Sequence, residues 1–416
     1  DEIEPGRPNA AGWILPPYHN IHRRYPEVAI LIPDTMGRAC GGLCSVCQRM
    51  YDFQRGELNF NLDKLKPRET WPEKLVKLLR YFEEDSQLRD ILVTGGDALM
   101  SSDQSLARIL DAIYEMALRK RKSNEDRPDG QKYAEIIRIR LGTRLPIYLP
   151  QRITDSLVRV LADYKEKASA IGIRQFVIQT HYETAMEVTP ESKEAVKKLL
   201  KAGWIVTNQQ VFTAQASRRG HTVKLRKVLN DIGVLPYYTF TVKGHMENYD
   251  SYVSTARSVQ EQMEEKAIGV IPVEYFASLS DFASEGERII DRMALLRDDL
   301  GVPFLATDRN VLNLPAVGKS LTYRVVGITS DGRRIVRYEH DHTRNHSPII
   351  EQMKHVFIVE SKSVEDYLVQ LEDMGENQNE YSSIFGYSIG ETEPRVPVYE
   401  YPEYEFRVTD KFTNFQ

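Results

Sequence analysis

The three cysteines of this chain, Cys40, Cys44 and Cys47, lie together in the stretch CGGLCSVC. Their spacing is C-x3-C-x2-C, and two glycines at 41–42 let the loop turn sharply enough for three thiolates to converge. Soft thiolate ligands select zinc, copper(I) or iron–sulfur clusters. An odd number of clustered cysteines is not typical of a disulfide framework. The loop therefore indicates a metal centre in a reducing compartment.

The missing fourth cysteine distinguishes the candidate metals. Structural zinc normally takes four protein ligands, and no histidine lies near this loop in the sequence. A cubane iron–sulfur cluster with three protein ligands leaves one iron open to a substrate or cofactor. An incomplete zinc site and three unligated buried thiols remain the alternatives.

Short β-branched runs alternate with longer amphipathic ones, which predicts βα units around a parallel sheet. The predicted strands cover residues 27–33, 90–96, 135–141, 174–180, 204–211 and 236–242. The predicted helices cover residues 71–84, 103–118, 154–168, 189–203 and 222–233. Six such units fit either a partly closed barrel or an open sheet.

Local signals support these boundaries. Thr154 and Thr189 have the character of helix N-caps, and Gly203 and Gly233 are typical of helix ends. Residues 322–341 predict a hairpin that turns at Asp331-Gly332. The acidic, tyrosine-rich segment from about residue 390 predicts a wrapping arm or a partly disordered tail.

The composition excludes several classes of protein. The chain has 416 residues, a formal net charge of -5, 41% hydrophobic and 28% charged residues, as expected of a globular protein that does not bind nucleic acid. The basic run at 119–122 predicts a solvated loop. No apolar run reaches the roughly 18 residues of a membrane span, and the polar start predicts no signal peptide. We therefore expect a cytoplasmic location.

The cysteine spacing, placed after the first strand of a βα series, resembles the radical S-adenosylmethionine superfamily. Longer stretches resemble one branch of it, the lysine 2,3-aminomutase family. The matching stretches occur in the family's order and cover residues 23–40, 91–103, 140–154, 179–183, 202–211, 235–244 and 313–319.

This resemblance implies a fold and a set of cofactors. The fold would be an α/β partial (βα)6 barrel at residues 27–245, with an N-terminal extension at 1–26. Residues 246–345 would form the region that carries the pyridoxal-phosphate lysine and closes over the substrate, and residues 346–416 a C-terminal extension that could serve as an oligomerisation arm. The cofactors would be a 4Fe-4S cluster, S-adenosylmethionine and pyridoxal 5′-phosphate. The enzyme would be an isomerase that uses an electron donor such as flavodoxin or ferredoxin and forms a homo-oligomer.

The resemblance also assigns residues to S-adenosylmethionine. Cys40, Cys44 and Cys47 would ligate three irons, so that the open iron could bind the amino acid end of this cofactor. The stretch Gly95-Gly96-Asp97 would approach its methionine moiety, and His181 and Gln209 match further positions near it.

Pyridoxal phosphate binding follows from other positions. Lys319, in NLPAVGK, matches the lysine that holds this cofactor as a Schiff base, an imine between the lysine amine and the cofactor aldehyde. Arg24 matches an arginine that binds its phosphate. Where the family has a second arginine this chain has Val28, and Arg144 is a candidate to complete the phosphate site.

The predicted catalytic set also includes three substrate-binding residues. Arg49 matches the arginine that pairs with the substrate α-carboxylate, for which a structural ion pair is the alternative. Lysine-specific relatives hold the distal ammonium with two aspartates, where this chain has Lys243 and Asn313. An ammonium about 4 Å from Lys243 would meet roughly 4 kcal/mol of repulsion at an effective dielectric near 20. The pair resembles the glutamate 2,3-aminomutase branch and predicts conversion of L-glutamate to β-glutamate.

Two alternative functions stay open. One is a radical S-adenosylmethionine enzyme of the same fold that acts on another acidic or neutral amino acid. The other is a non-catalytic scaffold that binds an iron–sulfur cluster.

Overall fold

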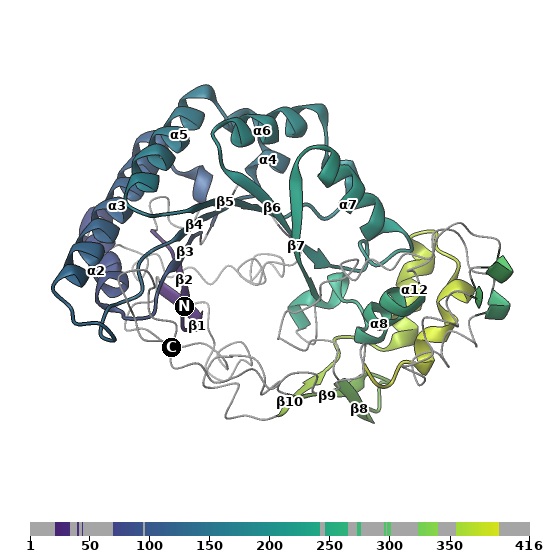
Figure 1. The fold of residues 1–416 in the computed structure, drawn as a ribbon. Helices are drawn as coiled ribbons and strands as arrows, with labels where there is room; N and C mark the ends of the chain where they lie inside the picture. Colours follow the sequence, from purple (N-terminus) through teal and green to yellow (C-terminus); the bar gives the residue numbers. More distant parts are fainter. Residues whose placement is uncertain are drawn as a thin grey trace.

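The computed structural model describes residues 21–33, 40, 44, 70–94, 96–241, 246–264, 273–275, 295–296, 298–300, 323–339 and 355–390. Two sheets form within these residues, one of seven strands and one of three. The larger sheet lies beneath an outer row of helices, and the smaller one belongs to the C-terminal part of the chain (Figure 1).

The seven strands of the large sheet lie side by side in sequence order. They are β1 (Ile21–Tyr25), β2 (Val28–Leu31), β3 (Asp90–Val93), β4 (Arg138–Gly142), β5 (Gln175–Thr180), β6 (Ile205–Phe212) and β7 (Val234–Thr241). From β2 to β7 every pair is parallel, whereas β1 pairs with β2 antiparallel. The six predicted strands are confirmed, and β1 is an additional edge strand.

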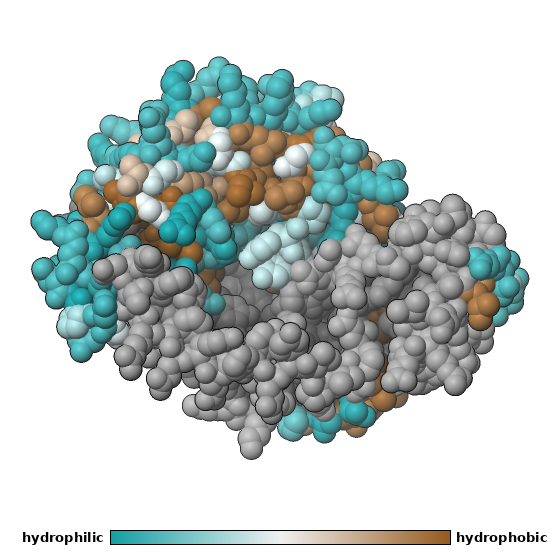
Figure 2. All heavy atoms as spheres, viewed as in Figure 1, coloured by the Kyte–Doolittle hydropathy of each residue, from teal (hydrophilic) through white to brown (hydrophobic). Residues whose placement is uncertain are grey.

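Helices connect the parallel strands and cover one side of the sheet (Figure 1). They are α2 (Trp71–Glu84), α3 (Asp103–Glu125), α4 (Leu145–Tyr148), α5 (Asp155–Ala170), α6 (Pro190–Lys201) and α7 (His221–Asp231). Their apolar faces and alternate strand residues, such as Ile139 and Leu141 of β4, form one continuous core. Hydrophilic side chains cover much of the outer surface above it (Figure 2). The α/β class with a parallel sheet is confirmed.

The predicted helix boundaries follow from local hydrogen bonds. The side chain of Thr154 accepts from Leu157 N and starts α5, and Thr189 accepts from Ser192 N and starts α6. Gly203 follows the end of α6 with φ 79°, a left-handed conformation that glycine adopts without a Cβ clash. The predicted N-caps Thr154 and Thr189 and the predicted helix end at Gly203 are therefore confirmed.

The prediction for the basic run at 119–122 is wrong. These residues belong to the last turns of α3, and Lys120 is fully buried. Its ammonium donates to the carbonyls of Phe82 (2.9 Å), Asp85 (2.8 Å) and Leu88 (2.9 Å) at the end of α2 and beyond. The carbonyls at a helix C-terminus lack hydrogen-bond donors within the helix, and here the ammonium of one lysine is the donor.

The small sheet contains β8 (Tyr323–Ile328), β9 (Arg334–Glu339) and β10 (His355–Val359), all antiparallel in the order β10-β9-β8. The predicted hairpin is confirmed as β8 and β9, with Gly332 at φ 79° in the turn. The other described C-terminal elements are α8 (Thr255–Glu264), α12 (Val364–Asp373) and the 3-10 helix Gln378–Gly386.

The C-terminal elements share a second hydrophobic core with the end of β6 and the segment that follows it. Phe212, Ala214 and Ala216 pack with residues of α8, α12 and β9 in this core. Residues 1–20 and 391–416 lie outside the described part of the chain, so the predicted extensions and the other domain limits stay predictions. None of the described helices is long and apolar enough to cross a membrane.

Candidate functional site

The carboxyl ends of the parallel strands meet along one edge of the large sheet, which is where ligands bind in α/β folds. Four of the predicted site residues belong to this edge. Asp97 follows β3, Arg144 follows β4, His181 follows β5, and Gln209 lies in the second half of β6. The strand order therefore brings together residues that are far apart in the sequence.

Asp97 joins the ends of two neighbouring strands. Its side chain is buried and accepts hydrogen bonds from Leu99 N (3.0 Å) and from Arg144 N (2.6 Å). Burial raises the pKa of the Asp97 carboxyl, although these hydrogen bonds oppose the shift. Through its hydrogen bond to Arg144 N, Asp97 fixes the backbone from which the Arg144 side chain extends.

Arg144 is the cation at the centre of this edge, and its side chain is only 11% exposed. One guanidinium nitrogen, Nη2, donates to Glu187 Oε1 (2.9 Å), and the guanidinium lies over the Tyr148 ring, 4.3 Å from its centre. The other terminal nitrogen, Nη1, donates to the sulfur of Cys44 (3.0 Å). The structure thus places the predicted phosphate-binding arginine beside a predicted cluster ligand.

Of the three cysteines, the structure describes Cys44, which is partly exposed, and Cys40, which is exposed. The Cys44 sulfur also lies 3.6 Å from the Tyr148 hydroxyl. Soft sulfur donors beside a buried cation suit an anionic iron–sulfur centre. The Nε atom of Arg144 is buried without a partner among the described residues, which leaves a donor for an anionic ligand.

His181 and Gln209 lie close to each other, as their predicted common ligand requires. Burial and the nearby charge of Arg144 lower the pKa of His181 to about 4, although a hydrogen bond to the Gln209 backbone opposes this shift. His181 is therefore neutral at neutral pH. A neutral imidazole can donate and accept, which suits recognition of a polar, uncharged group.

Glu183 is a candidate residue that the sequence interpretation missed. Its Oε2 accepts from Val211 N (2.9 Å), while Oε1 is buried without a partner among the described residues. Burial raises the pKa of Glu183 to about 8, although Arg144 and the Val211 hydrogen bond oppose the shift. The available signal was its position two residues after His181, just past the end of a strand.

Gly142, the last residue of β4, has little free space around it. A Cβ added at this position would lie 2.8 Å from Thr94 Oγ1 and 3.0 Å from Thr94 Cβ. Thr94 leads directly into the predicted Gly95-Gly96 approach to the cofactor. Glycine at position 142 therefore lets the two strand ends come close together without displacing this turn.

A charged network starts at the amino ends of the same strands. Arg140 Nε and Arg138 Nη1 donate to the Asp90 carboxylate at 2.9 Å and 3.2 Å. Arg140 also donates to Gln179 Oε1 (3.1 Å). Asp90 and Arg138 are the first residues of their strands, whereas Gln179 is the last residue but one of β5, so this network runs from the amino ends of the strands toward the carboxyl edge.

Several predicted site residues lie outside the described part of the chain. They are Arg49, Lys243, Asn313, Lys319, Cys47 and Gly95. Gly96 lies in the segment between β3 and Asp97, and Arg24 is described only by its place in β1. Their predicted roles, and those of the remaining site residues, stay predictions.

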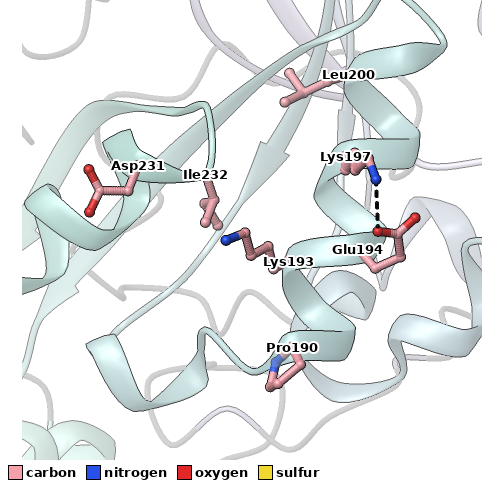
Figure 3. A pocket seen from close by; sticks show the side chains of 7 residues that line it. All are labelled: Pro190, Lys193, Glu194, Lys197, Leu200, Asp231 and Ile232. Carbon is pink, nitrogen blue, oxygen red and sulfur yellow. Dashed lines mark hydrogen bonds and ion pairs between the residues drawn. The ribbon is translucent and has the colours of Figure 1, made fainter.

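A groove of about 340 Å³ lies between α6 and the end of α7 (Figure 3). It is lined by Pro190, Lys193, Glu194, Lys197, Leu200, Asp231 and Ile232. Lys197 already pairs with Glu194 at 3.4 Å, as the dashed line in Figure 3 marks. None of the predicted site residues lines this groove, so it does not enter the chemistry considered below.

Comparison with known proteins finds relatives that carry the names of the KamA family and of aminomutases. The chain is 30% identical over 376 residues to an uncharacterized KamA family protein of Methanocaldococcus jannaschii, covering 89% of this chain and 49% of that one. It is 32% identical over 225 residues to an L-lysine 2,3-aminomutase of Methanococcus maripaludis, covering 54% and 43%. It is also 32% identical over 224 residues to a glutamate 2,3-aminomutase of Clostridioides difficile, covering 54% and 44%. No family model matches the chain.

The parallel sheet, the cysteine loop and these relatives together define an α/β protein of the aminomutase type. The chain belongs to the lysine 2,3-aminomutase family. It spans about half the length, or slightly less, of the curated relatives named above. Family membership implies a 4Fe-4S cluster and S-adenosylmethionine.

Proposed function

We propose that this chain is a radical S-adenosylmethionine and pyridoxal-phosphate-dependent 2,3-aminomutase with L-glutamate as its substrate and β-glutamate as its product. The observation that supports the chemistry best is the contact between Arg144 and the sulfur of Cys44 (3.0 Å) at the carboxyl edge of the parallel sheet. It puts a predicted cluster ligand beside strand ends that carry the other predicted cofactor contacts.

The residues of this edge have distinct proposed roles. Cys40, Cys44 and Cys47 would hold the cluster, which supplies the electron that generates a radical from S-adenosylmethionine when both are bound. His181 and Gln209 would lie near this cofactor. The sheet around them would form the partial (βα)6 barrel that the family resemblance implies.

The substrate assignment is supported by residue types in the sequence. Lys243 would pair with the distal carboxylate of glutamate, Asn313 would donate an amide hydrogen bond to it, and Arg49 would pair with the α-carboxylate. Lys319 would hold pyridoxal phosphate, and Arg24 would bind its phosphate group. A flavodoxin or ferredoxin as reductant, a homo-oligomeric assembly and a cytoplasmic location belong to the same proposal.

Cofactor content tests the proposal independently of turnover. We expect iron and sulfide in a cubane ratio in the anaerobically reconstituted protein, and an electron paramagnetic resonance signal of the reduced cluster that changes when S-adenosylmethionine is added. We also expect a visible absorption band of bound pyridoxal phosphate that is lost in Lys319→Ala and kept in Cys44→Ala. A cluster signal that ignores S-adenosylmethionine would favour the non-catalytic scaffold.

Product analysis tests the substrate. The reduced enzyme is incubated with glutamate, aspartate, lysine and arginine, and β-amino acids are identified by mass spectrometry. Glutamate alone should give product, because Lys243 would repel the distal cations of lysine and arginine, and the side chain of aspartate is one C–C bond too short for the same anchors. In the variant with Lys243→Asp and Asn313→Asp, turnover of glutamate should fall at least tenfold, since one ion pair is replaced by repulsion. Product from lysine but not from glutamate in the unmodified enzyme would overturn the assignment.

A further inference from the structure

The Arg144 guanidinium is held in one orientation by three separate contacts. The backbone N of Arg144 donates to Asp97 Oδ2 (2.6 Å), Nη2 donates to Glu187 Oε1 (2.9 Å), and the Tyr148 ring stacks beneath the group at 4.3 Å. A planar guanidinium that is fixed at its backbone and at one nitrogen has little freedom left at the other. Nη1 is thereby directed at the Cys44 sulfur, 3.0 Å away.

The partners of Arg144 are fixed as well. Glu187 Oε2 accepts from Glu183 N (2.6 Å) and Thr184 N (3.3 Å), so the carboxylate that pairs with Arg144 is itself tied to the backbone after β5. Asp97 is buried and also accepts from Leu99 N. The arrangement amounts to a preformed donor for one particular sulfur, because neither acidic residue needs to move for Arg144 to reach it.

A hydrogen bond from a cation to a cysteinyl sulfur has a defined effect on an iron–sulfur cluster. Reduction adds negative charge to the cluster and its thiolates, and a neighbouring donor stabilises this charge more than it stabilises the oxidised state. Hydrogen bonds to the sulfurs and buried charges are among the features by which a protein sets the reduction potential. With its side chain 11% exposed, Arg144 exerts this effect with little screening by water.

We infer that Arg144 is a positioning residue that donates to the Cys44 thiolate and raises the reduction potential of the bound cluster. This inference rests on the proposed function, because it requires the cluster. It gives Arg144 a role beyond the predicted one in phosphate binding, because Nη1 and Nη2 have partners in Cys44 and Glu187. Asp97 and Glu187 act through Arg144 as the groups that aim it.

The test compares two variants of Arg144 with a matched control. Arg144→Gln removes the charge and the directed donor, and Arg144→Lys keeps the charge but loses the planar fork. Arg152→Gln serves as the control, because it removes the same charge from the chain at another place. Arg152 pairs with Asp103 at 2.7 Å and donates to the Ser101 carbonyl. Each protein is reconstituted, and its iron and sulfide content is determined before use.

The measurement is the midpoint potential of the cluster, followed by electron paramagnetic resonance during a reductive titration without substrate. We expect a more negative potential in Arg144→Gln, a smaller shift in Arg144→Lys and the unmodified value in Arg152→Gln. An unchanged potential in a fully loaded Arg144→Gln protein would overturn the inference and leave the proposed function intact.

The other outcomes are also decisive. If Arg144→Gln does not take up a cluster, the same comparison rests on Arg144→Lys, and an unshifted potential there overturns the inference. Loss of the cluster from both variants, with unchanged circular dichroism, would assign Arg144 to cluster assembly and reject its role in the potential. An unmodified protein that takes up no cluster would reject the proposed function together with the inference.

Discussion

Two titratable residues at the end of β5, His181 and Glu183, are shifted in opposite directions for the same reason. Burial disfavours the charged form of each, so the pKa of His181 falls to about 4 and the pKa of Glu183 rises to about 8. At neutral pH both side chains are then mostly uncharged, and Arg144 keeps its charge beside them. Arg144 also pairs with Glu187 at 2.9 Å, and its buried Nε keeps a donor for an anionic ligand at this edge.

The raised pKa of Glu183 makes folding stability depend on pH in a particular window. Between pH 6.5 and 8 the folded protein holds a proton on Glu183 that the unfolded chain has released, so stability should fall as pH rises. Below pH 6.5 the lowered pKa of His181 adds a slope of opposite sign, because the unfolded histidine gains a proton first. Urea unfolding across the window should show the decline in the unmodified protein and a flatter profile in Glu183→Gln.

A surface glutamate provides the control for this measurement. Glu194 is exposed on α6, and Glu194→Gln should keep the decline of the unmodified protein. If Glu183→Gln and the unmodified protein decline in parallel, then Glu183 does not hold its proton in this range.

At the scale of elements, the sequence predicted most of the large sheet because its strands are short apolar runs bounded by helices with recognisable caps. It missed β1, since the segment Ile21–Tyr25 contains two arginines and a histidine and lacks an apolar pattern. It missed the burial of Lys120 for a different reason. Four consecutive basic residues resemble a solvated segment, but the helical period places Lys120 on the buried face of α3 with Met116 and Ala117.

Lys120 should consequently matter for stability in a way that its neighbours do not. Lys120→Met leaves the carbonyls of Phe82, Asp85 and Leu88 without their donor, and we expect a loss on the order of 3 kcal/mol in the free energy of unfolding. Lys122→Met changes an exposed residue of the same helix and should cost less than about 0.5 kcal/mol. Equal unfolding midpoints for the two variants, measured in urea, would contradict this account of the α2 terminus.

The same contrast holds for the site. Strand order places Asp97, Arg144, His181 and Gln209 at one edge. The family resemblance predicted Asp97, His181 and Gln209 near one cofactor, but it assigned Arg144 to the phosphate of the other. The contact between Arg144 and Cys44 joins residues 100 positions apart and depends on the orientation of one side chain. No periodicity or local motif encodes such a contact, so it could be found only in the structure.

At the scale of the whole molecule, the C-terminal elements are attached to the large sheet through the segment after β6. The hydroxyls of Ser217 and Tyr367 lie 2.6 Å apart, Arg219 N donates to the Tyr381 hydroxyl (2.9 Å), and Arg257 Nε donates to the Ser217 carbonyl (3.0 Å). All three contacts reach residues 217–219. This segment continues directly from the strand that carries Gln209, so the C-terminal part helps to fix one side of the candidate site.

Removing one of these contacts should loosen the segment locally. Tyr367→Phe leaves the buried Ser217 hydroxyl without this partner, and we expect a cost of about 1 kcal/mol. Amide hydrogen exchange should speed up at residues 213–220 and stay unchanged in β3 and β4. Tyr164→Phe is the control, because the Tyr164 hydroxyl is buried without a partner among the described residues and its removal should not destabilise the protein. If exchange at residues 213–220 is unchanged in Tyr367→Phe, the C-terminal part of the chain does not hold this segment in place.

The in-order parallel sheet also determines what it costs to carry the cysteine loop. Register partners Val28 and Asp90 lie 62 positions apart in the sequence, whereas Val177 and Ile205 lie 28 apart. Because the entropy of closing a loop grows only with the logarithm of its length, the longer crossover is disfavoured by only about 0.7 kcal/mol relative to the shorter one. The crossover between β2 and β3, which contains all three cysteines, is therefore a place where this architecture can accept added chain, and with it new metal chemistry, at almost no thermodynamic cost to strand pairing.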